Sequence, residues 1–167
     1  NFPLYAFIII CFWLLGLIMI NVKARNSKVN NIGVFSLVIG LLILIYFVTH
    51  LWILLERPPL RTLGETRLWY SLFLAFVGLV TYTRWKYKWF LSYTFGVASF
   101  FLILNILHPE NYDKTLMPAL QSIWFVPHVI VYILSYALLA ASSLVAIHSL
   151  IQINFYNNKR HSTPLAD

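Results

Sequence analysis

Five long apolar runs, separated by short polar segments, are the feature that most limits how this chain folds. A helix that spans a bilayer needs roughly 20 apolar residues, and runs of about this length occupy residues 3–22, 32–55, 68–83, 89–107 and 123–156. Only 10% of the residues are charged, whereas average soluble domains carry roughly 25%. We therefore predict an all-α fold: one polytopic transmembrane helix bundle over residues 1–167, with about five spanning helices.

The basic residues are divided unevenly between the two sets of loops. One side of the predicted bundle carries Lys23, Arg25, Lys28, Arg84, Lys86, Lys88, Lys159 and Arg160. The other side carries Arg57, Arg61, Arg67 and Lys114, together with Glu56, Glu65, Glu110 and Asp113. The positive-inside rule assigns the more basic side to the cytoplasm. We expect the N-terminus outside, the C-terminus in the cytoplasm, and both long loops on the external face.

This charge pattern also bears on partners and location. The basic residues lie in short clusters between apolar runs rather than in a patch with exposed aromatic side chains, so the expected partner is the lipid membrane and not nucleic acid. We expect a multi-pass protein of the cell inner (plasma) membrane whose active face is external, or periplasmic.

Histidines are the residues most able to carry chemistry here, because ionisable groups within a membrane are costly and point to function. His128 follows Pro127 at the start of the last apolar run, and proline is tolerated in the first turn of a helix. A neutral imidazole on such a rigid element suits the iron of heme. The residues alone leave two interpretations open for His128, an axial ligand and an interfacial histidine. His50, near the external end of the second run, is either a structural hydrogen-bonding residue or a second candidate ligand.

The first external loop concentrates charge around Pro58 and Pro59. Arg57, Arg61 and Arg67 accompany two acids in this loop. One interpretation is a tight turn with surface ion pairs, each of which contributes little to stability. The other is an arginine-lined lip for an anionic ligand, since guanidinium groups pair with carboxylates through two parallel hydrogen bonds.

Two stretches resemble a known family. Leu51-Trp-Ile-Leu-Leu-Glu-Arg-Pro-Pro-Leu-Arg-Thr-Leu-Gly-Glu-Thr-Arg-Leu-Trp-Tyr70 is similar to an external loop of the CcsA/ResC-type cytochrome c biogenesis proteins. Met117-Pro-Ala-Leu-Gln-Ser-Ile-Trp-Phe-Val-Pro-His128-Val, followed by Ser135-Tyr136-Ala137, is similar to the segment of that family in which a loop, a tryptophan, a histidine and Ser-Tyr-Ala occur in this order.

The resemblance implies a heme-handling membrane protein and, for the site, particular residues. It implies that His128 is the first of two external histidines that ligate heme iron, and it makes Trp124 of the same motif a candidate heme contact. Arg57, Arg61 and Arg67 are our own candidates, from charge and side, for the heme propionates. The family's tryptophan-rich loop and second external histidine do not occur in this sequence, which starts at Asn1 and stops at Asp167. We expect a fragment that corresponds to the N-terminal part of the family domain.

The expected function is therefore a component of a cytochrome c synthase, or heme lyase, complex. It would bind heme b as cargo at the external face and present it to apocytochrome c, together with a CcsB/ResB-type membrane partner subunit, fused or separate. Two alternatives stay open: a bis-histidine heme electron-transfer subunit that uses His50 and His128, and a membrane assembly subunit without a cofactor.

Overall fold

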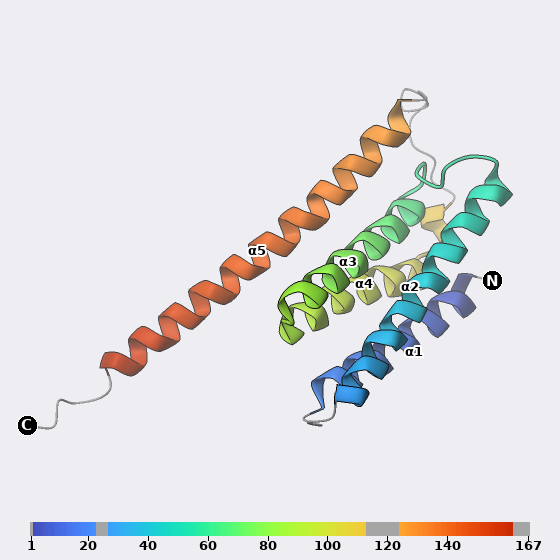
Figure 1. The fold of residues 1–167 in the computed structure, drawn as a ribbon. Coiled ribbons are helices and arrows are strands. Elements are labelled where there is room, and N and C mark those ends of the chain that lie inside the picture. Colours follow the sequence, from blue (N-terminus) through green and yellow to red (C-terminus); the bar gives the residue numbers. More distant parts are fainter. Residues whose placement is uncertain (1, 23–26, 113–123, 162–167) are drawn as a thin grey trace, which may run out of the picture.

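The computed structural model describes residues 2–22, 27–112 and 124–161, with side chains for residues 2–22, 28–110 and 124–154. Its helices are α1 (Phe2–Asn21), α2 (Ser27–Leu55), α3 (Leu63–Trp85), α4 (Lys88–Leu107), the short 3₁₀ helix η1 (Pro109–Tyr112) and α5 (Phe125–His161) (Figure 1). The five α-helices are each long and apolar enough to cross a membrane. The prediction of an all-α bundle with five spanning helices is confirmed.

Helix boundaries differ from the apolar runs mainly where polar residues extend a helix. Both α2 and α3 begin five residues before the predicted starts at 32 and 68. Hydropathy marks the part of a helix that lies in hydrocarbon, whereas backbone hydrogen bonds continue into the polar interface. At the other end of α3, Lys86 takes the left-handed conformation (φ 60°) and its N–H donates to the Tyr82 carbonyl at 2.9 Å. This residue ends α3 and starts the short turn into α4.

Close packing joins the first four helices in two pairs, α1 with α2 and α3 with α4. Small residues make this possible: a Cβ built on Gly16 would lie 2.8 Å from the Gly33 carbonyl oxygen, and one on Gly78 would lie 2.1 Å from Thr94 Oγ1. Trp13 of α1 and Phe95 of α4 meet edge to face, 5.1 Å between ring centroids, and so connect the two pairs. The core therefore runs through all four helices.

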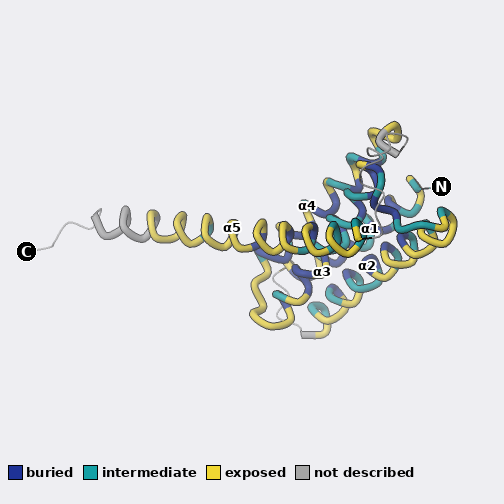
Figure 2. Tube along the Cα trace, turned by 90° about the horizontal axis from the view of Figure 1, so that it is seen from above, coloured by how far each residue is buried: buried dark blue, intermediate teal, exposed yellow. Residues whose placement is uncertain are grey.

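The last helix, α5, stands at one side of this bundle and packs chiefly on α3 (Figure 1). Its buried residues Ile133, Ala137 and Ala141 are spaced four apart and form a narrow stripe. Most of its other described side chains are exposed, as the predominance of yellow along α5 in Figure 2 shows. One stripe of α5 is thus buried by this chain, and the rest faces outward.

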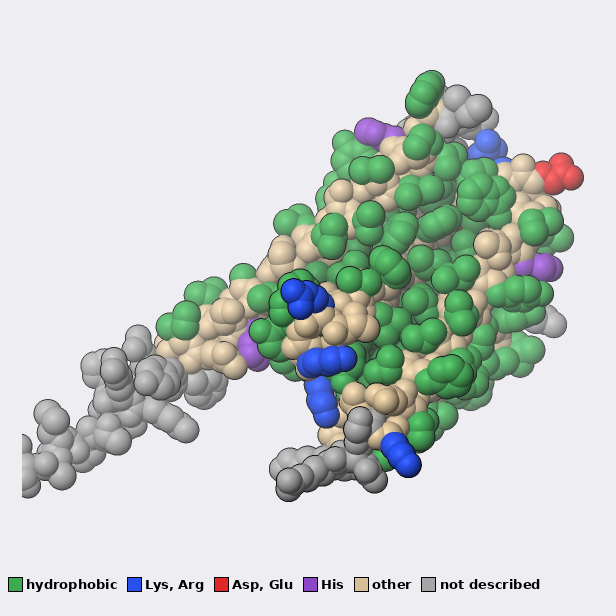
Figure 3. All heavy atoms as spheres, viewed as in Figure 1, with side chains coloured by type: hydrophobic (Ala, Val, Ile, Leu, Met, Phe, Trp, Pro, Cys, Tyr) green, Lys and Arg blue, Asp and Glu red, His purple; other side chains and the backbone are tan. Residues whose placement is uncertain are grey.

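Charge separates the two ends of the bundle. Lys28, Arg84, Lys86 and Lys88 lie where α2 begins and where α3 passes into α4, and Figure 3 shows basic side chains gathered at this end of the molecule. The opposite end carries the loop between α2 and α3 and the segment that follows α4. Lys23, Arg25, Asp113 and Lys114, which were also assigned to these ends from the sequence, lie outside the described residues.

Candidate functional site

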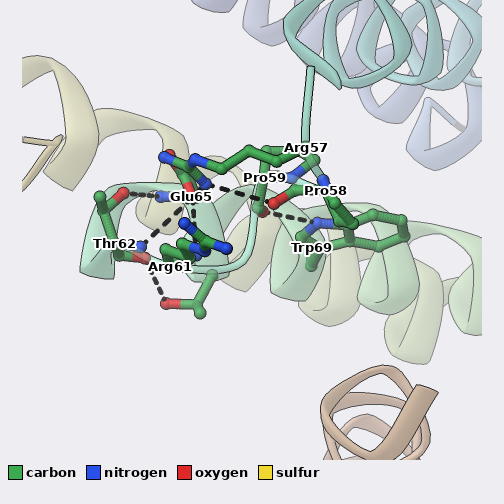
Figure 4. Close-up of polar contacts among 8 residues, drawn as sticks. Arg57, Pro58, Pro59, Arg61, Thr62, Glu65 and Trp69 are labelled. Carbon is green, nitrogen blue, oxygen red and sulfur yellow. Dashed lines mark hydrogen bonds and ion pairs between the residues drawn. The ribbon is translucent and has the colours of Figure 1, made fainter. Parts of the chain in front are cut away.

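The loop between α2 and α3 is built around the carboxylate of Glu65, whose side chain is 4% exposed. Arg57 donates to both carboxylate oxygens, Nη1 to Oε2 at 3.1 Å and Nη2 to Oε1 at 3.0 Å (Figure 4). The backbone N–H of Arg61 donates to Oε2 at 2.7 Å. A buried carboxylate that accepts this many hydrogen bonds fixes the path of the chain around it.

The same carboxylate also begins α3. Thr62 Oγ1 accepts a hydrogen bond from the N–H of Glu65 at 3.2 Å, and Glu65 Oε2 accepts one from the N–H of Thr62 at 3.3 Å. This reciprocal pair is a capping box, which satisfies backbone donors that a helix start would otherwise leave open. It explains why α3 begins at Leu63, ahead of its apolar run.

Two further hydrogen bonds fasten the loop to the helices around it. Trp69 Nε1 of α3 donates to the Pro59 carbonyl at 2.9 Å, and Asn105 Nδ2 of α4 donates to the Gly64 carbonyl at 2.9 Å. Leu60, between these two contacts, is 1% exposed. The loop is thus a fixed part of this end of the bundle and a suitable support for residues that contact a ligand.

The three arginines predicted to form an anion-binding lip have different surroundings. Arg57 is engaged by Glu65, as described above. The guanidinium of Arg61 makes no hydrogen bond or ion pair within the described part of the chain. Arg67 is half-buried on the first turns of α3, and its Nη1 is buried without a hydrogen-bond partner among the residues that the structure describes. Of the three guanidinium groups, that of Arg61 is therefore the one with donors open to an anionic group, whereas the open donor of Arg67 is buried.

Sequence reasoning missed Glu65 as the centre of this loop. The spacing Thr62-x-x-Glu65 is the sequence signature of a capping box, so the role of Glu65 at the start of the helix could have been predicted. The bidentate pair with Arg57 was not, because it depends on how the loop folds back over eight residues.

His128 lies in the first turns of α5, at the same end of the bundle as this loop (Figure 1). Its N–H donates to the Trp124 carbonyl at 3.4 Å. Its ring meets Tyr132 edge to face at 4.4 Å between centroids. Both His128 and Trp124 are exposed, the latter by 78%.

A shallow groove of about 550 Å³ continues from His128 along α5. Its lining residues His128, Val131, Tyr132, Ser135, Tyr136 and Leu139 recur at helical spacings of three and four, so they share one face. No hydrogen bond engages the His128 ring nitrogens in the described part of the chain. An accessible imidazole beside an apolar and aromatic face is a side chain that could ligate the iron of a heme.

The three other histidines whose side chains are described do not join this site. His50 is exposed on α2, 6.1 Å from the Tyr46 ring, and α5 packs against α3 rather than α2. His108 caps the end of α4 and contacts Glu110, Nδ1 to Oε1 at 2.9 Å. His148 stacks on Trp89. The structure thus does not pair His50 with His128, and no cluster of three or more potential metal-binding side chains occurs among the described residues.

Nor does a contact join His128 to the arginines. No hydrogen bond or ion pair connects them in the part of the chain that is described, although they lie at the same end of the bundle. The residues 117–122 of the motif that precedes Trp124 lie outside the described residues. The structure therefore presents two separate candidate elements, an arginine-bearing loop and a histidine-headed groove, at one end of the bundle.

The relatives found by sequence comparison that are described below share one description. The chain is 33% identical over 137 residues to the cytochrome c biogenesis protein CcsA of Panax ginseng. The matched region covers 80% of this chain and 41% of that protein. It is 35% identical over 136 residues to CcsA of Cucumis sativus, covering 78% of this chain and 40% of the relative. No family model and no solved structure matches the chain.

These relatives are longer than this chain, which spans about two-fifths of their length. Several further CcsA proteins match at comparable identity, among them that of Manihot esculenta at 33% over 130 residues. The similarity extends across most of this chain rather than being confined to one motif. Over this part of their length, the chain belongs to the CcsA-type cytochrome c biogenesis proteins.

Proposed function

We propose that this chain is the part of a cytochrome c biogenesis protein that holds heme b at the external face of the membrane for attachment to apocytochrome c. Similarity to CcsA supports a role in cytochrome c biogenesis. The single observation that carries the heme proposal is His128: an exposed imidazole with open ring nitrogens, at the head of an apolar and aromatic groove on a spanning helix. Trp124, four residues earlier, flanks the same position.

Within this proposal the residues have distinct roles. His128 would ligate the heme iron, and the apolar and aromatic face of α5 beside it would contact the porphyrin. Arg61 has donors open to the propionates, whereas Arg57 fixes the loop through Glu65. Heme supplies the reactive vinyl groups, which the thiols of apocytochrome c attack, while the protein binds, orients and shields the cargo.

The proposed setting follows from charge and from the relatives. The more basic end of the bundle faces the cytoplasm and the His128 end faces outward, in the cell inner membrane. The chain acts as part of a cytochrome c synthase complex with a CcsB/ResB-type membrane partner and apocytochrome c.

The test is the visible absorption spectrum of the complete protein that contains this chain, purified in detergent. His128→Ala is expected to lose heme or shift it toward a high-spin spectrum, and added imidazole is expected to restore the low-spin form. His50→Ala is the matched control, because it removes an exposed histidine on another helix, and its spectrum should equal that of the wild type.

Other outcomes have definite meanings. A wild-type spectrum for His128→Ala would remove this residue from the iron. Loss of heme in His50→Ala as well would favour a bis-histidine electron-transfer subunit. No heme in any sample, after hemin is supplied, would favour an assembly subunit without a cofactor.

A further inference from the structure

A second groove, of about 290 Å³, lies at the opposite end of the bundle between the first turns of α2 and the last turns of α3. Its two halves differ in chemistry. Asn31, Thr83 and Lys86 line the half at the helix ends, and Val34, Phe35 and Val38 line the half that continues along α2. The groove is therefore amphipathic along its length.

The polar half is held in place by contacts within the protein. Tyr82 donates its hydroxyl hydrogen bond to Asn30 Oδ1 at 2.8 Å, which ties α3 to α2 beneath the groove. Lys86 sits at the end of α3, with its ammonium 5.3 Å from the centroid of the Tyr82 ring. The left-handed backbone of Lys86 fixes where its side chain leaves the helix. The geometry presents a cation at the rim of a preformed depression.

Nothing in the described residues neutralises this cation. The described ion pairs are Arg57 with Glu65 and His108 with Glu110, both at the other end of the bundle. The groups near Lys86 are themselves basic: Arg84, Lys88 and Lys28. Lys88 is engaged locally, since its Nζ donates to the Ile20 carbonyl at 2.7 Å. The local field therefore favours an anion at the polar half of the groove.

We propose that this groove binds an anionic phospholipid, with the phosphate beside Lys86 and an acyl chain against Val34, Phe35 and Val38. A free phosphate would use only the polar half, whereas a lipid uses both. Lipid of this charge is enriched in the cytoplasmic leaflet, and each basic residue near such a surface contributes about 1 kcal/mol to binding. The site is independent of the heme proposal and needs only that this end of the bundle meets the membrane surface.

The experiment is native mass spectrometry of the detergent-purified complete protein, titrated with dioleoylphosphatidylglycerol or dioleoylphosphatidylcholine. The wild type is expected to retain phosphatidylglycerol preferentially. Lys86→Gln should lower that affinity about fivefold, the equivalent of about 1 kcal/mol. Arg84→Gln is the matched control: it removes the same charge two residues away, from a side chain outside the groove, and should change the affinity less than twofold.

A second variant blocks the groove without changing its charge. Asn31→Trp fills the groove from an exposed position, and it should abolish the preference for phosphatidylglycerol while circular dichroism stays as in the wild type. Equal losses in Lys86→Gln and Arg84→Gln would overturn the proposal in favour of diffuse attraction. Wild-type binding by Asn31→Trp would also overturn it, as would displacement of the lipid by millimolar inorganic phosphate alone. These measurements do not depend on heme, so their outcome is independent of the outcome of the His128 test.

Discussion

The imidazole of His148 lies flat on the indole of Trp89, with ring centroids 4.0 Å apart and ring planes 7° from parallel. This stack joins the last third of α5 to the first turn of α4. Among the described residues, few other contacts hold this part of α5, because most of the side chains described between Ser142 and Asn154 are exposed. The contact therefore helps to align α5 with the bundle. Because His128 and its groove lie on α5, the same contact affects the direction in which they face.

The stack should be measurable as a coupling energy. Aromatic pairs contribute about 0.5–1.5 kcal/mol beyond the area that they bury. We expect Trp89→Leu, His148→Leu and the double variant to give a coupling of this size in a double-mutant cycle, measured by unfolding in detergent. Additive effects of the two substitutions would mean that the rings do not stabilise one another.

Glu65→Gln is a small change in the side chain, but we expect it to destabilise the bundle clearly. The amide cannot accept two hydrogen bonds from Arg57 in the same way, and it leaves a guanidinium whose side chain is only 23% exposed without its charge partner. Hydrogen bonds to charged groups contribute about 1.5–3 kcal/mol, so we expect a loss of this order in the free energy of unfolding.

The control for Glu65→Gln is Glu56→Gln, which removes an exposed acid from the same loop. Surface substitutions of this kind usually change stability by less than about 0.5 kcal/mol. Equal unfolding energies for the two variants would show that the Arg57–Glu65 pair does not organise the loop.

Two glycines offer a matched test of helix packing. Gly78→Ala places a methyl group 2.1 Å from Thr94 Oγ1, so α3 and α4 must separate or Thr94 must rotate. Overpacking of this kind costs about 1–3 kcal/mol. Gly96→Ala meets no atom within 4 Å, and alanine is favoured over glycine in a helix by about 1 kcal/mol. We expect Gly78→Ala to lower the thermal midpoint of the detergent-purified protein and Gly96→Ala to leave it unchanged or raise it.

The orientation of the bundle can be read by labelling with a membrane-impermeant thiol reagent. In a Cys11→Ala background, which removes the chain's one cysteine, we expect Glu56→Cys and Glu110→Cys to react in intact cells. Arg84→Cys, at the basic end, should react only after the membrane is permeabilised. The reverse pattern would place His128 on the cytoplasmic side and contradict the proposed external site.

The two candidate elements of the site illustrate how far sequence reasoning extends. The position of His128 at the start of a spanning helix followed from Pro127 and the apolar run after it, because both are local signals. The arginine loop was recognised as a cluster of charge, but the sequence did not distinguish Arg57 from Arg61 and Arg67. Which guanidinium pairs with Glu65 depends on the conformation of the loop, and several pairings are equally close in sequence.

The sequence by itself determined the five spanning helices, their alternation and the basic end, because hydropathy and charge are sums over neighbouring residues and need no knowledge of distant ones. It also marked His128 and the motif that resembles the CcsA family. Only the tertiary structure decided that α5 packs on α3, that Arg57 is engaged by Glu65, and that His50 is not paired with His128. The first and the last depend on the packing of helices that are far apart in the chain. The second depends on how a loop folds back over eight residues, which local sums of hydropathy and charge do not describe.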